Sequence, residues 1–105
     1  MVITINAAGF ENEVLKSQQP VVVDCYADWC GPCKMMKPLF DMMANRYDGK
    51  VKFCSLNVDD NAEIAMKYNV ASIPNFLCFK DGQLVNNLVG ATTPDKFEDL
   101  IKGLL

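Results

Sequence analysis

An apolar strand that runs directly into a closely spaced pair of cysteines restricts the folds open to this chain. Residues 21–27 are apolar except for Asp24, and Cys30 and Cys33 follow shortly after them. A run that is apolar on both faces is typical of a central strand in a parallel sheet. Met, Leu and Phe residues dominate the segment after the pair, which favours a helix there. A Cys-x-x-Cys pair at a junction between strand and helix is typical of a redox site.

The two cysteines are expected to differ in their surroundings. The segment reads Trp29-Cys30-Gly31-Pro32-Cys33-Lys34. Cys30 should lie at a helix N-terminus, where free amides and the helix dipole stabilise a thiolate. Cys33 should lie one turn further on and deeper, while Gly31 lets backbone approach and Pro32 stiffens the turn. We therefore predict that Cys30 attacks, that Cys33 resolves, and that the pair carries two electrons by closing and opening a disulfide.

A zinc site is the structural alternative for such a pair. It would require four ligands, whereas the chain has no histidine and no second Cys-x-x-Cys, so we predict no metal site. The chain has five cysteines, and Cys25, Cys54 and Cys78 each lie in an apolar run. These three are predicted to be small buried hydrophobic residues. The odd count favours a reducing compartment over a secreted disulfide scaffold.

The length and composition of the chain further limit the class of protein to which it can belong. The chain has 105 residues, which predicts a single domain over residues 1–105. The net charge of −3 predicts no binding to nucleic acid or to an anionic membrane surface. No apolar run approaches the roughly 18–20 residues that span a bilayer. The N-terminal residues show neither a basic region nor a long apolar region, so we expect no secretory signal and a cytoplasmic location.

Two residues are unusual for their positions. Asp24 is a carboxylate within an apolar strand, and burial should raise its pKa. That suits a proton acceptor for Cys33, the alternative being an Asp that accepts local amide hydrogen bonds. Pro74 begins an expected strand although proline cannot donate to a ladder. The Ile73–Pro74 bond could be cis, although by itself this signal does not exclude an ordinary trans loop proline.

The remaining pattern predicts alternating strands and helices. Strands are expected at 2–5, 21–27, 51–58, 75–79 and 84–89. Helices are expected from Asn6 to Lys16, from Cys33 to Tyr47 with a kink at Pro38, from Asp60 to Tyr68, and from Thr93 onward. Asp60 and Glu63 have the spacing of a capping box, and Asp81-Gly82 predicts a hairpin. The methionines of the second helix are predicted to pack against the protein: Met35, Met36, Met42 and Met43. This order favours a three-layer α/β/α fold around one mixed sheet.

The chain resembles the thioredoxin family along nearly its whole length. The similarity is carried by Val23-Asp24, Trp29-Cys30-Gly31-Pro32-Cys33-Lys34, Pro38, Asn57-Val58-Asp59, Ser72-Ile73-Pro74, Phe79-Lys80-Asp81-Gly82 and Val89-Gly90-Ala91. The resemblance implies a thioredoxin fold with a five-stranded mixed sheet and four helices, and it implies that Pro74 is cis. It also implies a shallow apolar docking surface near the cysteines, made of Trp29, Gly31, Pro32, Ile73, Pro74, Gly90 and Ala91. Lys34 is a candidate for favouring the thiolate, the alternative being a solvated lysine.

The resemblance also implies the activity. Cys30 would attack a substrate disulfide, and Cys33, helped by Asp24, would release the reduced product. No cofactor would be bound, because the Cys30–Cys33 disulfide is itself the redox group. A thioredoxin reductase drawing on NADPH would regenerate the dithiol. The implied substrates include ribonucleotide reductase, methionine sulfoxide reductase and peroxiredoxin, and the protein would act as a monomer.

Three positions depart from the family's common pattern. Cys25-Tyr26 stands where Phe-Trp is frequent, and Asn75 stands where Thr often follows the proline. Ser55 stands where many bacterial members carry a lysine near the buried Asp. Without that counter-charge the pKa of Asp24 should rise further, so we predict weaker proton acceptance by Asp24 at neutral pH.

The sequence leaves two other functions as alternatives. One is a redox-silent binding module or assembly factor, which the intact cysteine pair argues against as the only role. The other is a disulfide oxidase, which is disfavoured because Gly31 and Pro32 form the dipeptide of reducing members and no secretory signal is expected.

Overall fold

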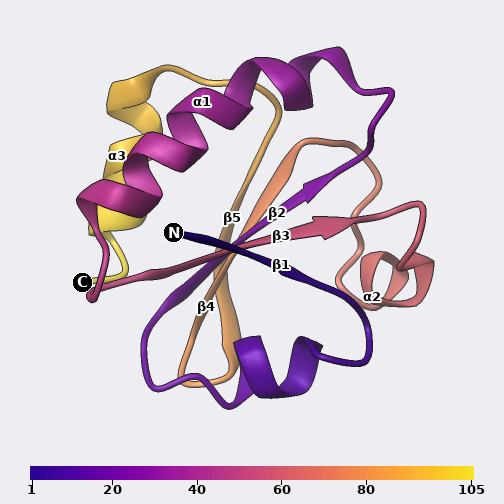
Figure 1. The fold of residues 1–105 in the computed structure, drawn as a ribbon, viewed down its shortest axis with the longest axis horizontal. Coiled ribbons are helices and arrows are strands. Elements are labelled where there is room, and N and C mark those ends of the chain that lie inside the picture. The colour runs from indigo at the N-terminus through magenta and orange to yellow at the C-terminus, as the bar shows by residue number, and fades with distance from the viewer.

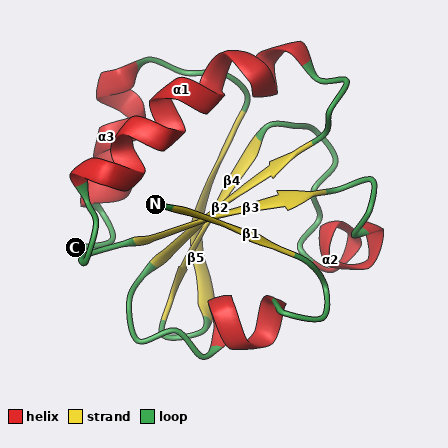
Figure 2. Ribbon diagram, in the orientation of Figure 1, coloured by secondary structure: helices red, strands yellow, loops and turns green.

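The computed structural model describes residues 1–105, and its centre is one five-stranded mixed sheet in the order β1-β3-β2-β4-β5 (Figure 2). The strands are β1 (Val2–Ile5), β2 (Val21–Tyr26), β3 (Lys52–Asn57), β4 (Asn75–Lys80) and β5 (Gln83–Val89). β1, β3 and β2 are parallel, whereas β4 and β5 pair antiparallel. The predicted mixed sheet is therefore confirmed, with β2 in its middle.

Helices cover both faces of the sheet. α1 (Gly31–Arg46) and α3 (Pro94–Lys102) lie on one face, while α2 (Ala62–Lys67) and the short π-helix η1 (Glu11–Leu15) lie on the other (Figure 1). This arrangement is the predicted three-layer thioredoxin fold with four helices. None of these helices combines the length and the apolar character that crossing a bilayer would require.

Aromatic packing holds α1 against the sheet. The ring of Phe40 lies 5.3 Å from that of Phe53 on β3, 5.9 Å from that of Phe76 on β4, and 6.1 Å from that of Phe97 on α3. All four rings are fully buried. Replacing such a phenylalanine by alanine typically costs about 3–5 kcal/mol. This cluster therefore fixes α1, and the cysteines at its start, relative to β2.

The methionines of α1 divide between core and surface. Met36 and Met43 are buried, as predicted, whereas Met35 and Met42 are 75% and 44% exposed. The prediction for the latter two is wrong, because they lie on the side of the helix turned away from the sheet.

The N-terminal helix is shorter than the predicted 6–16. The Asn6 side chain accepts a hydrogen bond from the Gly9 amide at 2.9 Å, and the Asn6 carbonyl accepts from the same amide at 3.1 Å. Residues 6–9 are thereby held as a turn, and helical structure begins only at Phe10. Phe10 and Val14 are both buried on one side, as predicted.

The predicted capping box at α2 is wrong. The N-cap is Asn61 rather than Asp60, and no side chain caps the helix. The side-chain amide of Asn61 forms hydrogen bonds outside α2. Its Oδ1 accepts from the Ala7 amide at 2.8 Å, and its Nδ2 donates to the Asn57 carbonyl at 2.9 Å. Asn57 Oδ1 in turn accepts from the amides of Asp59 and Asp60. This segment is therefore shaped by long-range and turn contacts instead of a local cap.

The predicted hairpin and the predicted start of α3 are confirmed, whereas the predicted start of α1 is not. Asp81 and Gly82 have φ angles of 54° and 78°, as a tight hairpin between β4 and β5 requires. Thr93 is the N-cap of α3, and its Oγ1 accepts from the Lys96 amide at 3.3 Å. α1 continues past Pro38 and begins at Gly31, two residues before the predicted start at Cys33.

Candidate active site

The two cysteines of the motif form a disulfide at the start of α1. Cys30 is the N-cap residue, and its Cα lies 5.2 Å from that of Cys33. The Cys33 amide donates to Cys30 Sγ at 3.2 Å. Pro32 fits in the first turn because amides there have no partner within the helix. Once the disulfide is reduced, the same amide and the helix dipole favour a thiolate at Cys30.

Burial does not separate the two cysteines in this oxidised form. Each is 4% exposed, so the prediction that Cys33 lies deeper is wrong here. The segment before β4 covers Cys30, whose Sγ lies 3.9 Å from the Ile73 carbonyl oxygen. The Ile73–Pro74 peptide bond is cis, as predicted. The Pro74 carbonyl accepts from the Gly90 amide at 2.7 Å, which brings the β5–α3 loop to the same place.

The predicted docking residues therefore gather around Cys30. Gly31, Pro32 and Ala91 are exposed, Ile73 and Gly90 are half-buried, and Pro74 is buried. Trp29, just before the disulfide, is 71% exposed. Its indole Nε1–H donates to Asp59 Oδ2 at 2.9 Å. This bond restrains a large apolar side chain that would otherwise be free in solvent.

Asp24 lies within β2 and faces α1. It is 6% exposed, and its Oδ1 has no hydrogen-bond partner. Burial raises the pKa of Asp24 to about 7, against a smaller lowering by Lys37 and with a further raising by Asp41. The predicted rise is therefore confirmed, and loss of hydration is its main cause. Lys37 itself forms an ion pair with Asp41 at 3.2 Å.

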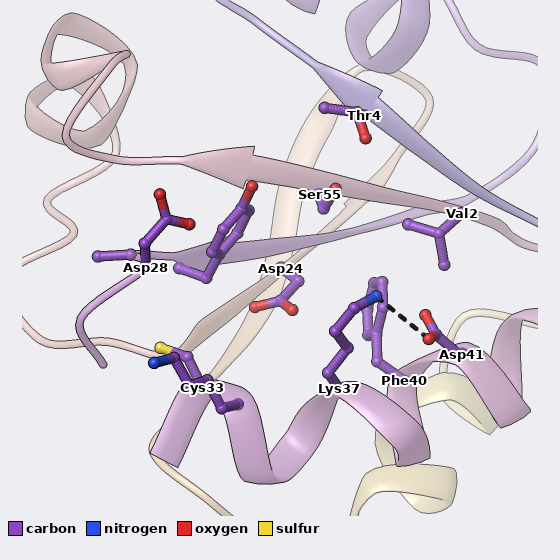
Figure 3. Close-up of a pocket in the computed structure, with 12 residues that line it drawn as sticks. Val2, Thr4, Asp24, Asp28, Cys33, Lys37, Phe40, Asp41 and Ser55 are labelled. Atoms are coloured by element: carbon purple, nitrogen blue, oxygen red, sulfur yellow. Dashed lines mark hydrogen bonds and ion pairs between the residues drawn. The ribbon is translucent and has the colours of Figure 1, made fainter. Parts of the chain in front are cut away.

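A cleft of about 530 Å³ is lined by both Asp24 and Cys33 (Figure 3). It lies between α1 and the β1-β3-β2 part of the sheet, and Asp24, Cys33 and Lys37 all line it. Figure 3 shows Asp24 pointing from β2 toward α1, between Cys33 and Lys37. Lys34 also lines the cleft although its side chain is exposed. The cleft gives solvent a route to the Asp24 carboxylate beside Cys33.

Sequence reasoning missed two parts of this site. Thr4 on β1, Ser55 on β3 and Asp24 on β2 are successive cross-strand partners, so they form a polar row that lines the cleft. The only signal for Thr4 was a polar residue at an alternate position of a short apolar strand. Asp59 was not predicted to contact Trp29, because the two residues lie 30 positions apart in the sequence.

The remaining cysteines are buried and unpaired, as predicted. Burial raises the pKa of Cys25, Cys54 and Cys78 to about 12, so these thiols are unreactive near neutral pH. No group of three or more His, Cys, Asp or Glu side chains is placed to hold a metal ion. Cys30 and Cys33 are the cysteines that form a disulfide.

A redox disulfide at the start of α1, beside a cis proline and a buried carboxylate, defines a dithiol–disulfide oxidoreductase. The thioredoxin family model matches residues 1–103. Thioredoxin of Pseudomonas aeruginosa is 47% identical over 90 residues, covering 86% of this chain and 83% of that protein. Thioredoxin of Haemophilus influenzae is 43% identical over 100 residues, covering 95% and 94%. Thioredoxin 1 of a Nostoc species is 48% identical over 82 residues, covering 78% and 77%. The chain belongs to the thioredoxin family.

Membership settles the activity. The chain is a thioredoxin-type protein disulfide reductase, and its active group is the Cys30–Cys33 disulfide rather than a bound cofactor. A reductase partner and disulfide-bearing proteins as substrates go with the family. No finding favours the redox-silent binding module.

Proposed function

We propose that Cys30 is the attacking thiolate, that Cys33 is the resolving thiol and that Asp24 accepts the proton of Cys33. The main support for the role of Asp24 is that Asp24 and Cys33 line the same cleft. In addition, Asp24 Oδ1 has no hydrogen-bond partner within the protein. The position of Cys30 as N-cap supports its role, because the Cys33 amide donates to its Sγ and the helix N-terminus favours a thiolate there.

The reaction proceeds in two exchanges. The Cys30 thiolate attacks one sulfur of the substrate disulfide, so a mixed disulfide forms and the other substrate sulfur leaves as a thiolate. Cys33 then transfers its proton to the Asp24 carboxylate and attacks Cys30 Sγ. The Cys30–Cys33 disulfide forms, the second substrate sulfur leaves, and the substrate has gained two electrons. The described structure corresponds to the protein after this second exchange.

Substrates would dock on the surface around Cys30 that Trp29, Gly31, Pro32, Ile73, Pro74, Gly90 and Ala91 form. The cis Pro74 and the loop at Gly90 are joined by a hydrogen bond, so they present one continuous edge beside the disulfide. The Ile73 carbonyl, which lies 3.9 Å from Cys30 Sγ, would accept a hydrogen bond from the backbone of an extended substrate segment. Lys34 would favour the thiolate electrostatically.

We also propose an electron donor, substrates and a location for the protein. The electron donor would be an NADPH-dependent thioredoxin reductase, and the substrates would include ribonucleotide reductase, methionine sulfoxide reductase and peroxiredoxin. Residues 1–105 would act as a single, monomeric domain in the cytoplasm, where three unpaired cysteines stay reduced. Size-exclusion chromatography with light scattering tests the monomer, and fractionation with a specific antibody tests the location.

The roles of the cysteines are tested by insulin reduction with NADPH and a thioredoxin reductase. Wild type should turn over, whereas Cys30→Ser should be inactive. Cys33→Ser should instead accumulate a mixed disulfide with insulin, visible by mass spectrometry. A mixed disulfide on Cys33 in the Cys30→Ser protein, with none on Cys30 in the reciprocal variant, would reverse the two roles. Repeating the assay with dithiothreitol separates an unsuitable reductase from an inactive dithiol.

The role of Asp24 is tested by single-turnover release of the mixed disulfide across pH. The release rate in wild type should rise through about pH 7, where Asp24 becomes ionised. Asp24→Asn should be slower at pH 8 and should lose that inflection. An unchanged pH profile in Asp24→Asn would remove Asp24 from the mechanism.

A further inference from the structure

The loop between β5 and α3 is attached at three successive points. Gly90 donates its amide to the Pro74 carbonyl at 2.7 Å, and Thr93 caps α3. Between them, the Thr92 amide donates to the Sδ atom of Met36 at 3.5 Å. The loop runs beside the first turns of α1 (Figure 1). Met36 is thus the one side chain of α1 that hydrogen-bonds to the loop carrying Gly90 and Ala91.

Core packing alone does not account for this contact. Met36 is 4% exposed and belongs to the same apolar cluster as Phe40 and Phe97. Any apolar side chain of similar size would fill that space. A thioether, however, is also a hydrogen-bond acceptor, if a modest one. Thr92 is half-buried, and an amide removed from water without an acceptor would be unfavourable.

The backbone amide of Ala91, next to that of Thr92, is not hydrogen-bonded in this way. The N–H of Ala91, which is exposed, has no acceptor within the protein. The loop therefore has a free amide at Ala91 and a bound amide at Thr92, and the bound one fixes how far the loop stands from α1. Cys33 precedes Met36 by three residues, so the contact relates the loop to the very turn that carries the disulfide.

We propose that Met36 is a positioning residue for the docking loop. Its Sδ atom accepts the Thr92 amide and thereby sets the place of Gly90 and Ala91 relative to Cys30. The proposal rests on the proposed docking role of these two loop residues. Met36 touches no substrate and acts through the loop alone, so its loss affects the binding of protein partners and leaves the chemistry of the disulfide intact.

The test compares Met36→Leu with Met43→Leu. Both variants remove a buried thioether from the same core cluster on α1, but Met43 makes no hydrogen bond to the loop. Met36→Leu should raise KM for the thioredoxin reductase and for insulin by roughly two- to tenfold with kcat nearly unchanged. Met43→Leu should keep the wild-type KM. Reduction of the disulfide by dithiothreitol, which needs no docking surface, should be equal in both variants and wild type.

Amide hydrogen exchange provides a second readout that a merely structural role would not produce. In wild type the Thr92 amide should exchange at least about tenfold more slowly than the Ala91 amide. In Met36→Leu the difference should largely disappear, whereas Met43→Leu should retain it. Equal exchange of the two amides in wild type would overturn the proposal without need of any variant.

An Ala91→Glu variant separates failure of this proposal from failure of the proposed docking surface. If Ala91→Glu raises KM while Met36→Leu and Met43→Leu share one KM, Met36 has no positioning role. If Ala91→Glu leaves KM unchanged in an active protein, the docking surface itself is wrong and this proposal falls with it. A raised KM in both Ala91→Glu and Met36→Leu, with Met43→Leu unaffected, supports both.

Discussion

Asp24 on β2 and Ser55 on β3 are direct cross-strand partners on the face of the sheet that α1 covers. The cross-strand partner of the buried carboxylate is therefore a short neutral side chain. The basic group that lowers the pKa of Asp24 is Lys37 on α1. Lys37 is itself exposed and paired with Asp41, which limits the charge it can offer. Burial consequently dominates, and the pKa of Asp24 stands at about 7.

A lysine at position 55 should reverse part of this effect. Ser55→Lys places a cation one strand away from Asp24, and an opposite charge at such range lowers a carboxyl pKa by about 1–3. The measurement is a carbon-13 NMR titration of the Asp24 carboxyl in the oxidised protein. Ser55→Met is the matched control, since it adds length without charge and should not lower the pKa. An Asp24 pKa that stays near 7 in Ser55→Lys would contradict this account.

The stability of the oxidised protein should fall as pH rises from about 4 to about 7. The pKa of Asp24 is raised from 3.8 to about 7 on folding, so in this window the folded chain holds a proton that the unfolded chain has lost. The full effect is about 4 kcal/mol, since one pKa unit corresponds to about 1.4 kcal/mol.

Urea unfolding of wild type and Asp24→Asn at pH 4 and pH 8 measures this effect. On going from pH 4 to pH 8, the free energy of unfolding of Asp24→Asn should rise relative to that of wild type, because the amide side chain of the variant does not ionise. Other groups titrate equally in both proteins and cancel in the comparison. Parallel pH dependences in the two proteins would show that the buried carboxylate is not the cause.

Removal of the Asp59 carboxylate should free the Trp29 indole. Asp59→Ala eliminates the 2.9 Å hydrogen bond, so the indole N–H should exchange faster and the tryptophan should lose fluorescence anisotropy. The free energy of unfolding should change by less than about 1 kcal/mol, because the bond is exposed. Asp60→Ala is the control, since it removes an equal charge from the adjacent residue and leaves the hydrogen bond between the Trp29 indole and Asp59 in place. Identical anisotropy in the two variants would show that Asp59 does not restrain Trp29.

Gly82, in the turn between β4 and β5, should be required for stability for two reasons that can be measured separately. A Cβ at Gly82 would lie 2.7 Å from the Leu15 carbonyl oxygen, and the φ angle of +78° is unfavourable for other residues. Gly49 has a similar φ of +82° with no atom within 4 Å of such a Cβ. Gly49→Ala therefore measures the conformational cost alone, about 1 kcal/mol.

Gly82→Ala should cost at least about 1–3 kcal/mol more than Gly49→Ala, because the β4–β5 turn or the end of η1 must move. Chemical denaturation of the two variants provides the comparison. Equal losses would mean that the close approach between the turn and Leu15 is relieved without cost.

Local chemistry made most of the fold predictable. The apolar run of β2, the Asp81-Gly82 turn and the Thr93-Pro94 helix start depend on neighbours in the sequence, and the structure confirms each. The error at the start of α2 falls where distant residues intervene. Asn61 is drawn into bonds with Ala7 and Asn57, so the expected cap at Asp60 does not form.

The sequence by itself determined the redox pair, the raised pKa of Asp24 and the family. A cysteine pair before a helix and a carboxylate in an apolar strand carry their chemistry through residue type and local burial. The tertiary structure alone decided which groups meet across long separations: Trp29 with Asp59, Thr4 with Ser55 and Met36 with Thr92. Such meetings depend on strand register and on how α1 and the loops pack, and no local pattern encodes a contact between residues that only the closed sheet brings together.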